Sequence, residues 1–183
     1  SLALILMTPA TTILLSFSNN ARARELPHRI VSQFAGRQNL IAADILLLDR
    51  TLTLAVVYSP PSESVPFTVL DHLYDYNRDL ILIGDFNARH SNWHDAVTNP
   101  QGQQLANWID GNDNLQVFNS AQPTSARSDA IIDLVIAPSL LSNELACVDH
   151  TIRVTDHYPV RWIISSLSLN QFSDRDEIIH RTG

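Results

Sequence analysis

The sequence of 183 residues contains no lysine, so all 12 of its basic side chains are arginine. Its 19 acidic residues give a formal net charge of −7, which argues against a module that coats nucleic acid through a basic surface. An acidic protein can still act on nucleic acid when a bound cation supplies positive charge locally. The Gly-x-Ser-x-Gly motif of serine hydrolases and the glycine-rich loop of NTPases are also absent, which argues against both classes.

Cysteine and long uninterrupted apolar segments are scarce as well. The single cysteine, Cys147, excludes an intrachain disulfide and a metal site built from cysteines. Residues 1–17 are strongly apolar, but Pro9 interrupts them and no basic residue precedes them. The segment is therefore too short and broken for a membrane span, and it lacks the charged start of a signal peptide. We expect a core strand there, no membrane partner and no secretion.

The rest of the composition is typical of one globular domain. Hydrophobic residues make up 45% of the chain, which is enough for a sizeable core. We expect this domain over residues 1–166 and a polar tail or linker over residues 167–183. Because the chain does not begin with Met, we also expect a fragment or a processed chain.

Apolar runs with short polar breaks predict more strands than helices. The dipeptide Asp49-Arg50 between two such runs indicates a hairpin, and the apolar residues around Leu70 recur at helical spacing. An irregular segment or edge strand is expected over residues 21–34. The expected helices are 62–77 and 101–110, and the expected strands are 11–17, 39–48, 51–58, 80–83, 115–118, 131–137, 146–154 and 160–164. This order predicts an α/β (α+β) fold, a mixed sheet with helices outside it.

Polar residues follow or interrupt these runs at three places. The apolar run 80–83 stops at Gly84, and Asp85 and Asn87 come directly after it. In an extended backbone these two side chains project to the same side. One of them is suited to a hard cation and the other to a substrate oxygen, so this stretch is the first candidate for a site.

The second and third clusters supply a pair of partners. Asp133 lies inside an otherwise apolar run, where a lone carboxylate is costly unless it is paired or coordinated. His157 is an attractive partner, because a carboxylate on one ring nitrogen fixes the tautomer and leaves the other nitrogen to act. The adjacent Asp156 points elsewhere and is free to bind metal or to activate water.

Together these motifs resemble the endonuclease/exonuclease/phosphatase superfamily, which has the DNase I-like fold. In family order they are Tyr58-Ser59-Pro60-Pro61, Gly84-Asp85-Phe86-Asn87, Ile132-Asp133-Leu134 and Thr155-Asp156-His157-Tyr158-Pro159. The longer string GDFNARHSNW is most similar to the endonuclease domains of non-LTR retrotransposons. The resemblance implies a four-layer sandwich, with two mixed β-sheets and helices outside.

The resemblance also implies a divalent-metal-dependent phosphodiesterase, a hydrolase that nicks DNA. Asp85 would orient the attacking water, with Asn87 steadying it. His157, oriented by Asp133, would stabilise the charge of the transition state. Asp156 would help to hold Mg²⁺, with Mn²⁺ as the second candidate. The implied partners are DNA and a reverse transcriptase domain of the same polyprotein, and the implied location is the nucleus.

The sequence departs from the family pattern before Tyr58, the residue that would reach the phosphate. The family carries an Asn on its first strand and a metal-binding Glu before this tyrosine. The 57 residues that precede Tyr58 offer only Glu25, in an Arg-rich stretch without matching context. We therefore expect an N-terminally truncated domain. The alternatives are a catalytically impaired relic or non-catalytic module of the same fold, and a phosphomonoesterase of the same superfamily.

Arg89, His90 and Trp93 follow the central motif and are candidates for substrate contacts. Arg89 suits either a phosphate clamp or a surface position. Trp93 suits either base stacking or core packing. His90 and His94 have zinc-ligand spacing on a helix, but no Glu follows His90, so a substrate groove or a solvated loop is favoured.

Overall fold

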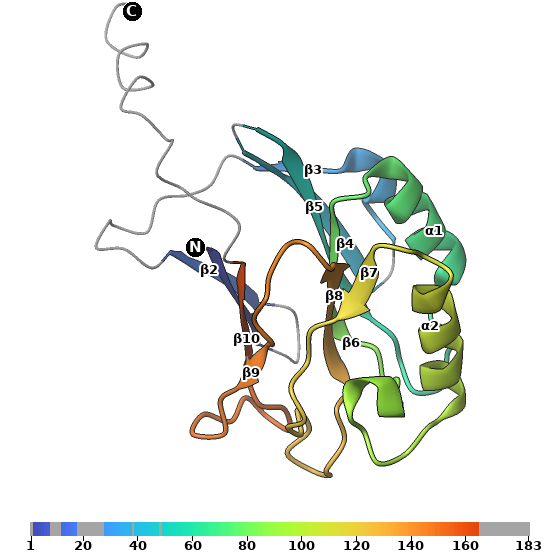
Figure 1. Ribbon diagram of the computed structural model, residues 1–183, viewed down its shortest axis with the longest axis vertical. Helices are drawn as coiled ribbons and strands as arrows, with labels where there is room; N and C mark the ends of the chain where they lie inside the picture. The colour runs from blue at the N-terminus through green and yellow to red at the C-terminus, as the bar shows by residue number, and fades with distance from the viewer. Residues whose placement is uncertain (1, 8–11, 18–27, 38, 48, 165–183) are drawn as a thin grey trace, which may run out of the picture.

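The computed structural model describes residues 2–7, 12–17, 28–37, 39–47 and 49–164, and for 2–7 and 12–17 it describes only the backbone. Figure 1 shows a helical layer and two sheets packed side by side. The polar tail expected at 167–183 and the residue Glu25 lie outside the described residues.

The larger sheet has six strands in the order β3-β4-β5-β6-β8-β7. The hairpin expected around Asp49-Arg50 is confirmed, since β4 and β5 pair antiparallel. β5 and β6 are parallel, because α1 (Phe67–Tyr76) carries the chain back across the sheet between them. The strands are β3 (His28–Ile30), β4 (Leu40–Leu46), β5 (Thr51–Tyr58), β6 (Leu80–Asp85), β7 (Leu115–Val117) and β8 (Asp133–Pro138).

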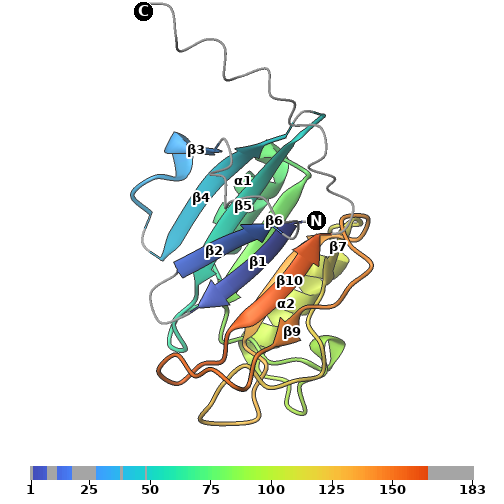
Figure 2. The ribbon, with the colours of Figure 1, turned by 90° about the vertical axis from the view of Figure 1, so that its left-hand side faces the viewer.

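The smaller sheet has four strands in the order β2-β1-β10-β9, and its described pairings are antiparallel. The apolar start of the chain forms two strands, β1 (Leu2–Met7) and β2 (Thr12–Phe17), where we predicted one. β1 pairs with β10 (Val160–Ile164), so segments from the two ends of the described chain lie side by side (Figure 2). The strand expected at 146–154 is wrong in extent, because only β9 (Cys147–Val148) pairs with β10.

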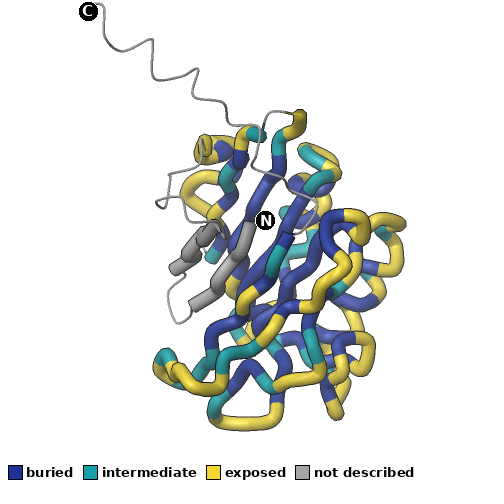
Figure 3. Tube along the Cα trace, turned by 60° about the vertical axis from the view of Figure 1, so that its left-hand side comes forward, coloured by how far each residue is buried: buried dark blue, intermediate teal, exposed yellow. Residues whose placement is uncertain are grey.

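The larger sheet lies between the helices and the smaller sheet, and it buries both of its faces (Figure 3). Side chains alternate along β5 and β6. Val57 and Leu82 belong to the core under α1 and α2 (Pro100–Asp110), whereas Val56 and Ile83 belong to the core against the smaller sheet. Both faces are thus apolar, which explains the continuous apolar runs in these strands.

The predicted α/β fold with two sheets and an outer helical layer is confirmed, but the described residues show three of the four expected layers. The larger sheet is mixed and the smaller one is antiparallel in its described pairings. Within the described ranges both α-helices cover the larger sheet (Figure 1). None of the described helices is long and apolar enough to cross a membrane.

Candidate active site

One edge of the larger sheet gathers the polar residues that end its central strands. β6 ends at Asp85 and β8 begins at Asp133, and these two residues are register partners in the antiparallel ladder. On the other side of Asp85 the parallel register partner is Tyr58, the last residue of β5. Three residues predicted from separate motifs therefore meet at one edge because the strand order places their strands together.

Glycine is required immediately before Asp85. Gly84 has a φ of +147°, and a Cβ built on it would lie 1.8 Å from the carbonyl oxygen of Val57 on the neighbouring strand. Any side chain here would push β5 and β6 apart. The Gly-Asp sequence of the central motif is thus a steric requirement for bringing Asp85 to this edge.

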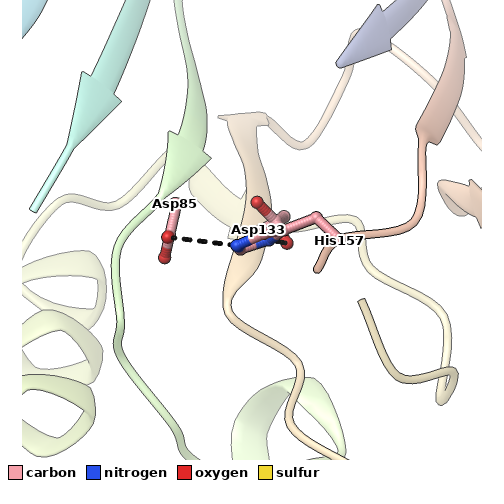
Figure 4. A group of neighbouring side chains, drawn as sticks. All are labelled: Asp85, Asp133 and His157. Atoms are coloured by element: carbon pink, nitrogen blue, oxygen red, sulfur yellow. Dashed lines mark hydrogen bonds and ion pairs between the residues drawn. The ribbon is translucent and has the colours of Figure 1, made fainter. Parts of the chain in front are cut away.

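His157 forms the centre of the site, between two carboxylates (Figure 4). Its Nδ1 lies 2.8 Å from Asp133 Oδ2 in a hydrogen bond, and its Nε2 lies 3.8 Å from Asp85 Oδ2. The predicted Asp133–His157 pairing is therefore present. The other oxygen of Asp133, Oδ1, is buried and has no hydrogen-bond partner among the described residues. One ring nitrogen is held by a carboxylate, and the other lies near the carboxylates of Asp85 and Asp156.

Asp156 lies on the more exposed side of the same histidine. Its Oδ1 is 3.9 Å from His157 Nε2 and accepts a hydrogen bond from the Thr155 hydroxyl at 3.0 Å. Its Oδ2 is 3.0 Å from the Nε of Arg127. The backbone of Thr155 has a φ of +57°, and this left-handed turn presents Asp156 and His157 one after the other to the site.

The protonation of the site differs from that of isolated groups. Burial, together with the charge of Asp133, raises the pKa of Asp85 to about 6. The hydrogen bond with Asp133 raises the pKa of His157, although burial acts in the opposite direction. Asp85 is therefore a stronger proton acceptor than an ordinary carboxylate, and His157 is more readily protonated than an ordinary histidine.

Asn87 secures the Asp85 carboxylate and the end of β5. Its backbone is left-handed, with a φ of +47°, and its N–H donates to Asp85 Oδ1 at 2.9 Å. Its side-chain Nδ2 donates to the carbonyl oxygen of Ser59 at 2.9 Å. The neighbouring Tyr58 is 44% exposed at the mouth of the site. Asn87 thus binds protein groups on both sides of Asp85.

Two buried residues that the sequence did not indicate hold the backbone of Asp133. The Thr124 hydroxyl accepts hydrogen bonds from the N–H groups of Ile132 and Asp133, both at 3.0 Å. The Asn119 side chain donates to the Asp133 carbonyl at 2.8 Å and accepts from the Val135 N–H at 2.9 Å. No local pattern marks these residues, because their contacts span 8 to 16 positions along the chain.

The candidate substrate contacts after the central motif serve the loop instead. The Arg89 guanidinium pairs with Asp95, its Nε lying 3.0 Å from both carboxylate oxygens. His90 Nδ1 accepts the Asn92 N–H at 3.0 Å, which caps the short 3₁₀ helix η2 (Ser91–Trp93). Trp93 is 1% exposed and donates to the Ala88 carbonyl at 3.2 Å. The structure places Trp93 in the core, where it presents no face to a base.

Asp95 connects this loop to the strand that carries Asp133. Its Oδ2 accepts the Ile131 N–H at 2.8 Å, and its Oδ1 accepts the Val97 N–H at 2.9 Å. With the Arg89 pair, every oxygen of this buried carboxylate has a partner. Asp95 and Arg89 together fix the separation between the segments that follow β6 and precede β8.

The chemistry of the donors fits a hard divalent cation. Ligand atoms of Asp85, Asp133 and His157 lie within 4.8 Å of one another. Because Asp133 Oδ2 and His157 Nδ1 bind each other, the donors left for a cation are Asp133 Oδ1 and the carboxylate oxygens of Asp85 and Asp156. Oxygen donors of this kind suit a hard cation such as Mg²⁺.

Comparisons with known proteins concern the fold and the family of the chain. The endonuclease domain of TRAS1, a telomere-specific non-LTR retrotransposon, is 20% identical with a TM-score of 0.64, over 87% of this chain and 76% of that one. Cytolethal distending toxins are less similar. The Actinobacillus actinomycetemcomitans toxin is 14% identical with a TM-score of 0.47, over 77% of this chain and 60% of that one. The Haemophilus ducreyi toxin is 16% identical with a TM-score of 0.41, over 88% of this chain and 57% of that one. No curated protein matches.

The first of these structures has the DNase I-like endonuclease architecture that the motifs predicted. A family model described as endonuclease-reverse transcriptase matches residues 52–161, which include every strand that meets at the site edge. The matched segment is more than half of the chain. The chain therefore belongs to the endonuclease-reverse transcriptase family, with the hydrolase class and the DNase I-like fold that this family implies.

Proposed function

We propose that this protein hydrolyses a phosphodiester bond in one strand of DNA with the help of a divalent cation. The observation that carries the proposal is the Asp133–His157 pair, whose free Nε2 faces the carboxylates of Asp85 and Asp156. Membership of an endonuclease family supports nucleic acid as the substrate.

Asp85 is the proposed proton acceptor for the attacking water. Its pKa of about 6 leaves it ionised at neutral pH, yet more basic than a solvated carboxylate. The Asn87 N–H holds one of its oxygens, so the other is aimed toward His157 and the reacting phosphate. Positioning of this kind converts a water molecule into an oriented nucleophile.

His157 is the proposed donor to the phosphate. With Nδ1 held by Asp133, a protonated Nε2 can donate to a phosphate oxygen as negative charge develops there. Asp133 acts as a positioning residue, since it fixes the ring and favours the protonated form. Tyr58, exposed at the mouth beside Asp85, is the proposed further contact to the phosphate.

Asp156 is the proposed ligand for the cation, Mg²⁺ by preference and Mn²⁺ as the second candidate. A divalent cation supplies charge neutralisation and Lewis acidity at the phosphate. It also relieves the mutual repulsion of the site carboxylates in a protein of net charge −7. The reverse transcriptase partner and the nuclear location stay predictions.

Nicking of supercoiled plasmid DNA by the 183-residue chain tests the proposal. We expect nicked circles with Mg²⁺ or Mn²⁺, none with EDTA, and a loss of about 10³-fold in His157→Ala and Asp156→Ala. Asp49→Ala, in an exposed turn at the opposite end of β5, is the matched control and should nick like the wild type. Equal nicking by all four proteins, or none by the wild type, would overturn the proposal.

The two alternatives have separate signatures in the same preparation. A relic or non-catalytic module would show neither nicking nor a calorimetric Mg²⁺ signal that depends on Asp156. A phosphomonoesterase would release phosphate from small monoesters and leave the plasmid supercoiled. Nicking, Mg²⁺ calorimetry and phosphate release together therefore separate the three functions.

A further inference from the structure

Arg127 places a guanidinium group at the open edge of the acidic site. Its Nε lies 3.0 Å from Asp156 Oδ2, and its side chain is 76% exposed, against 27% for Asp156. Among the ion pairs in the described part of the chain, this is the one that joins an arginine to a site carboxylate. The guanidinium is thus attached to the site on one side and open to solvent on the other.

The backbone around Arg127 is fixed by the site segment itself. The Ala126 N–H donates to the Asp156 carbonyl at 2.7 Å, and Ser125 forms a β-bridge with His157. The Arg127 N–H in turn bonds the Ser125 hydroxyl at 3.2 Å. The base of the Arg127 side chain therefore keeps its place beside Asp156 whether or not the ion pair is formed.

The ion pair with Asp156 uses only some of the hydrogen-bond donors of Arg127. A guanidinium has five N–H donors in a planar fork, and its geometry matches two oxygens of a phosphate. Nε faces Asp156, and within the described residues we find no further partner for the Nη groups. An ion pair this exposed contributes little to stability, so holding the fold does not account for it.

We propose that Arg127 binds a backbone phosphate of the DNA through its Nη groups while its Nε group holds Asp156. This inference rests on the proposed function, which supplies DNA as the ligand. Asp156 lies between the two positive groups, with Oδ2 toward Arg127 and Oδ1 toward His157. Arg127 would therefore bind DNA and orient the Asp156 carboxylate at the same time.

The net charge makes one such contact measurable. With a charge of −7, the protein depends on local cationic groups for DNA affinity, and no lysine is available to substitute. Each phosphate contact that is lost lowers the slope of log affinity against log salt by about 0.9. A residue that only positions Asp156 would leave this slope unchanged, so the slope separates the two roles.

The test is the affinity of the full chain for a fluorescent DNA duplex, measured in EDTA as a function of salt for Arg127→Gln, Arg127→Lys and Arg50→Gln. We expect about tenfold weaker binding and a slope lower by about 0.9 for Arg127→Gln. Arg127→Lys should keep the slope and lose less affinity, because it keeps the charge but not the fork. Arg50, in an exposed Nε–carboxylate pair with Asp49, is the matched control and should behave like the wild type.

The outcomes separate this inference from the function on which it rests. If the wild type nicks DNA but Arg127→Gln binds with wild-type affinity and slope, this inference alone is wrong, even if nicking falls. A wild type that neither binds nor nicks DNA overturns both. All variants should unfold at the wild-type temperature, since the substituted side chains are exposed.

Discussion

Four buried carboxylates in the described part of the chain fall into two pairs with opposite surroundings. Asp44 and Asp95 have hydrogen-bond partners on both of their oxygens. Asp85 and Asp133 do not: Asp133 Oδ1 has no partner, and Asp85 Oδ2 faces His157 Nε2 at 3.8 Å, beyond hydrogen-bond distance. The first pair is complete as it stands, and the second pair leaves oxygens available.

The pKa values of Asp44, Asp95 and Asp85 follow the same division. Burial alone would raise the pKa of Asp95, but hydrogen bonds from Arg89, Ile131 and Val97 together lower it. The pKa of Asp44 is likewise lowered against burial, chiefly by Arg29. The pKa of Asp85 instead rises to about 6. Burial therefore does not distinguish a structural carboxylate from a reactive one in this fold, whereas the number of satisfied oxygens does.

The largest effect should come from Asp133→Asn, which removes the charge that orients His157. We expect nicking to fall about 10³-fold with the fold intact. Asparagine has the shape of aspartate, but without the negative charge it does not hold the His157 ring in the required tautomer or favour its protonated form. The pKa of His157 should also fall, since the hydrogen bond with Asp133 is the main cause of its elevation. The alkaline limb of the pH–rate profile would then move to lower pH.

NMR titration of the His157 ring protons in wild type and variant measures that pKa independently of activity. An unchanged His157 pKa together with wild-type nicking would show that Asp133 does not serve this histidine. The ring protons of His150, which contacts Tyr158 outside the site, provide the internal control.

The next effect concerns a satisfied carboxylate. Asp95→Ala should lower the free energy of unfolding by about 3 kcal/mol or more, because it leaves the Arg89 guanidinium and the Ile131 N–H without their buried acceptor. Urea denaturation measures this loss. Asp49→Ala, which breaks an exposed pair, should cost less than about 1 kcal/mol. Equal losses of unfolding free energy in the two variants would contradict the structural role assigned to Asp95.

The smallest expected effect concerns the loop after β6, which we expect to contribute to stability and not to DNA binding. His90→Ala should reduce stability by about 1 kcal/mol, because it removes the cap of η2. DNA affinity should stay at the wild-type level, in contrast to Arg127→Gln. A loss of DNA affinity in His90→Ala without a loss of stability would restore the substrate contact that the sequence predicted.

Much of the site could be predicted because its parts are local signals. Apolar runs located the strands, and the polar residues at their ends marked Asp85 and Asp133. The cost of a lone buried carboxylate indicated a partner for Asp133, and the structure supplies His157. The glycine before Asp85 marks a close approach of two strands.

The remaining parts depend on contacts that no local pattern reveals. An arginine such as Arg89 is suited to bind a phosphate. In the structure its guanidinium is instead paired with Asp95, six positions later in the chain. The sequence around Thr124 and Asn119 does not distinguish them from ordinary loop residues. Their role arises only from their hydrogen bonds to β8 in the folded protein. The strand predicted at 11–17 corresponds to β2, whereas the apolar residues before Pro9 do not predict β1 as a separate strand. Partners chosen by tertiary structure decide these roles.

The most direct test is to measure stability and nicking of Asp85→Asn in one preparation. A folded pKa raised from 3.8 to about 6 means that the contribution of Asp85 to stability is most favourable below about pH 4 and is lost as the pH rises to about 6 and above. In EDTA at pH 7.5 the asparagine variant should therefore be more stable than the wild type by up to about 3 kcal/mol, with no difference near pH 4. With Mg²⁺ its nicking should be about 10³-fold lower. A variant that is less stable at pH 7.5, or that nicks within tenfold of the wild type, would contradict the assignment of Asp85 as the reactive carboxylate.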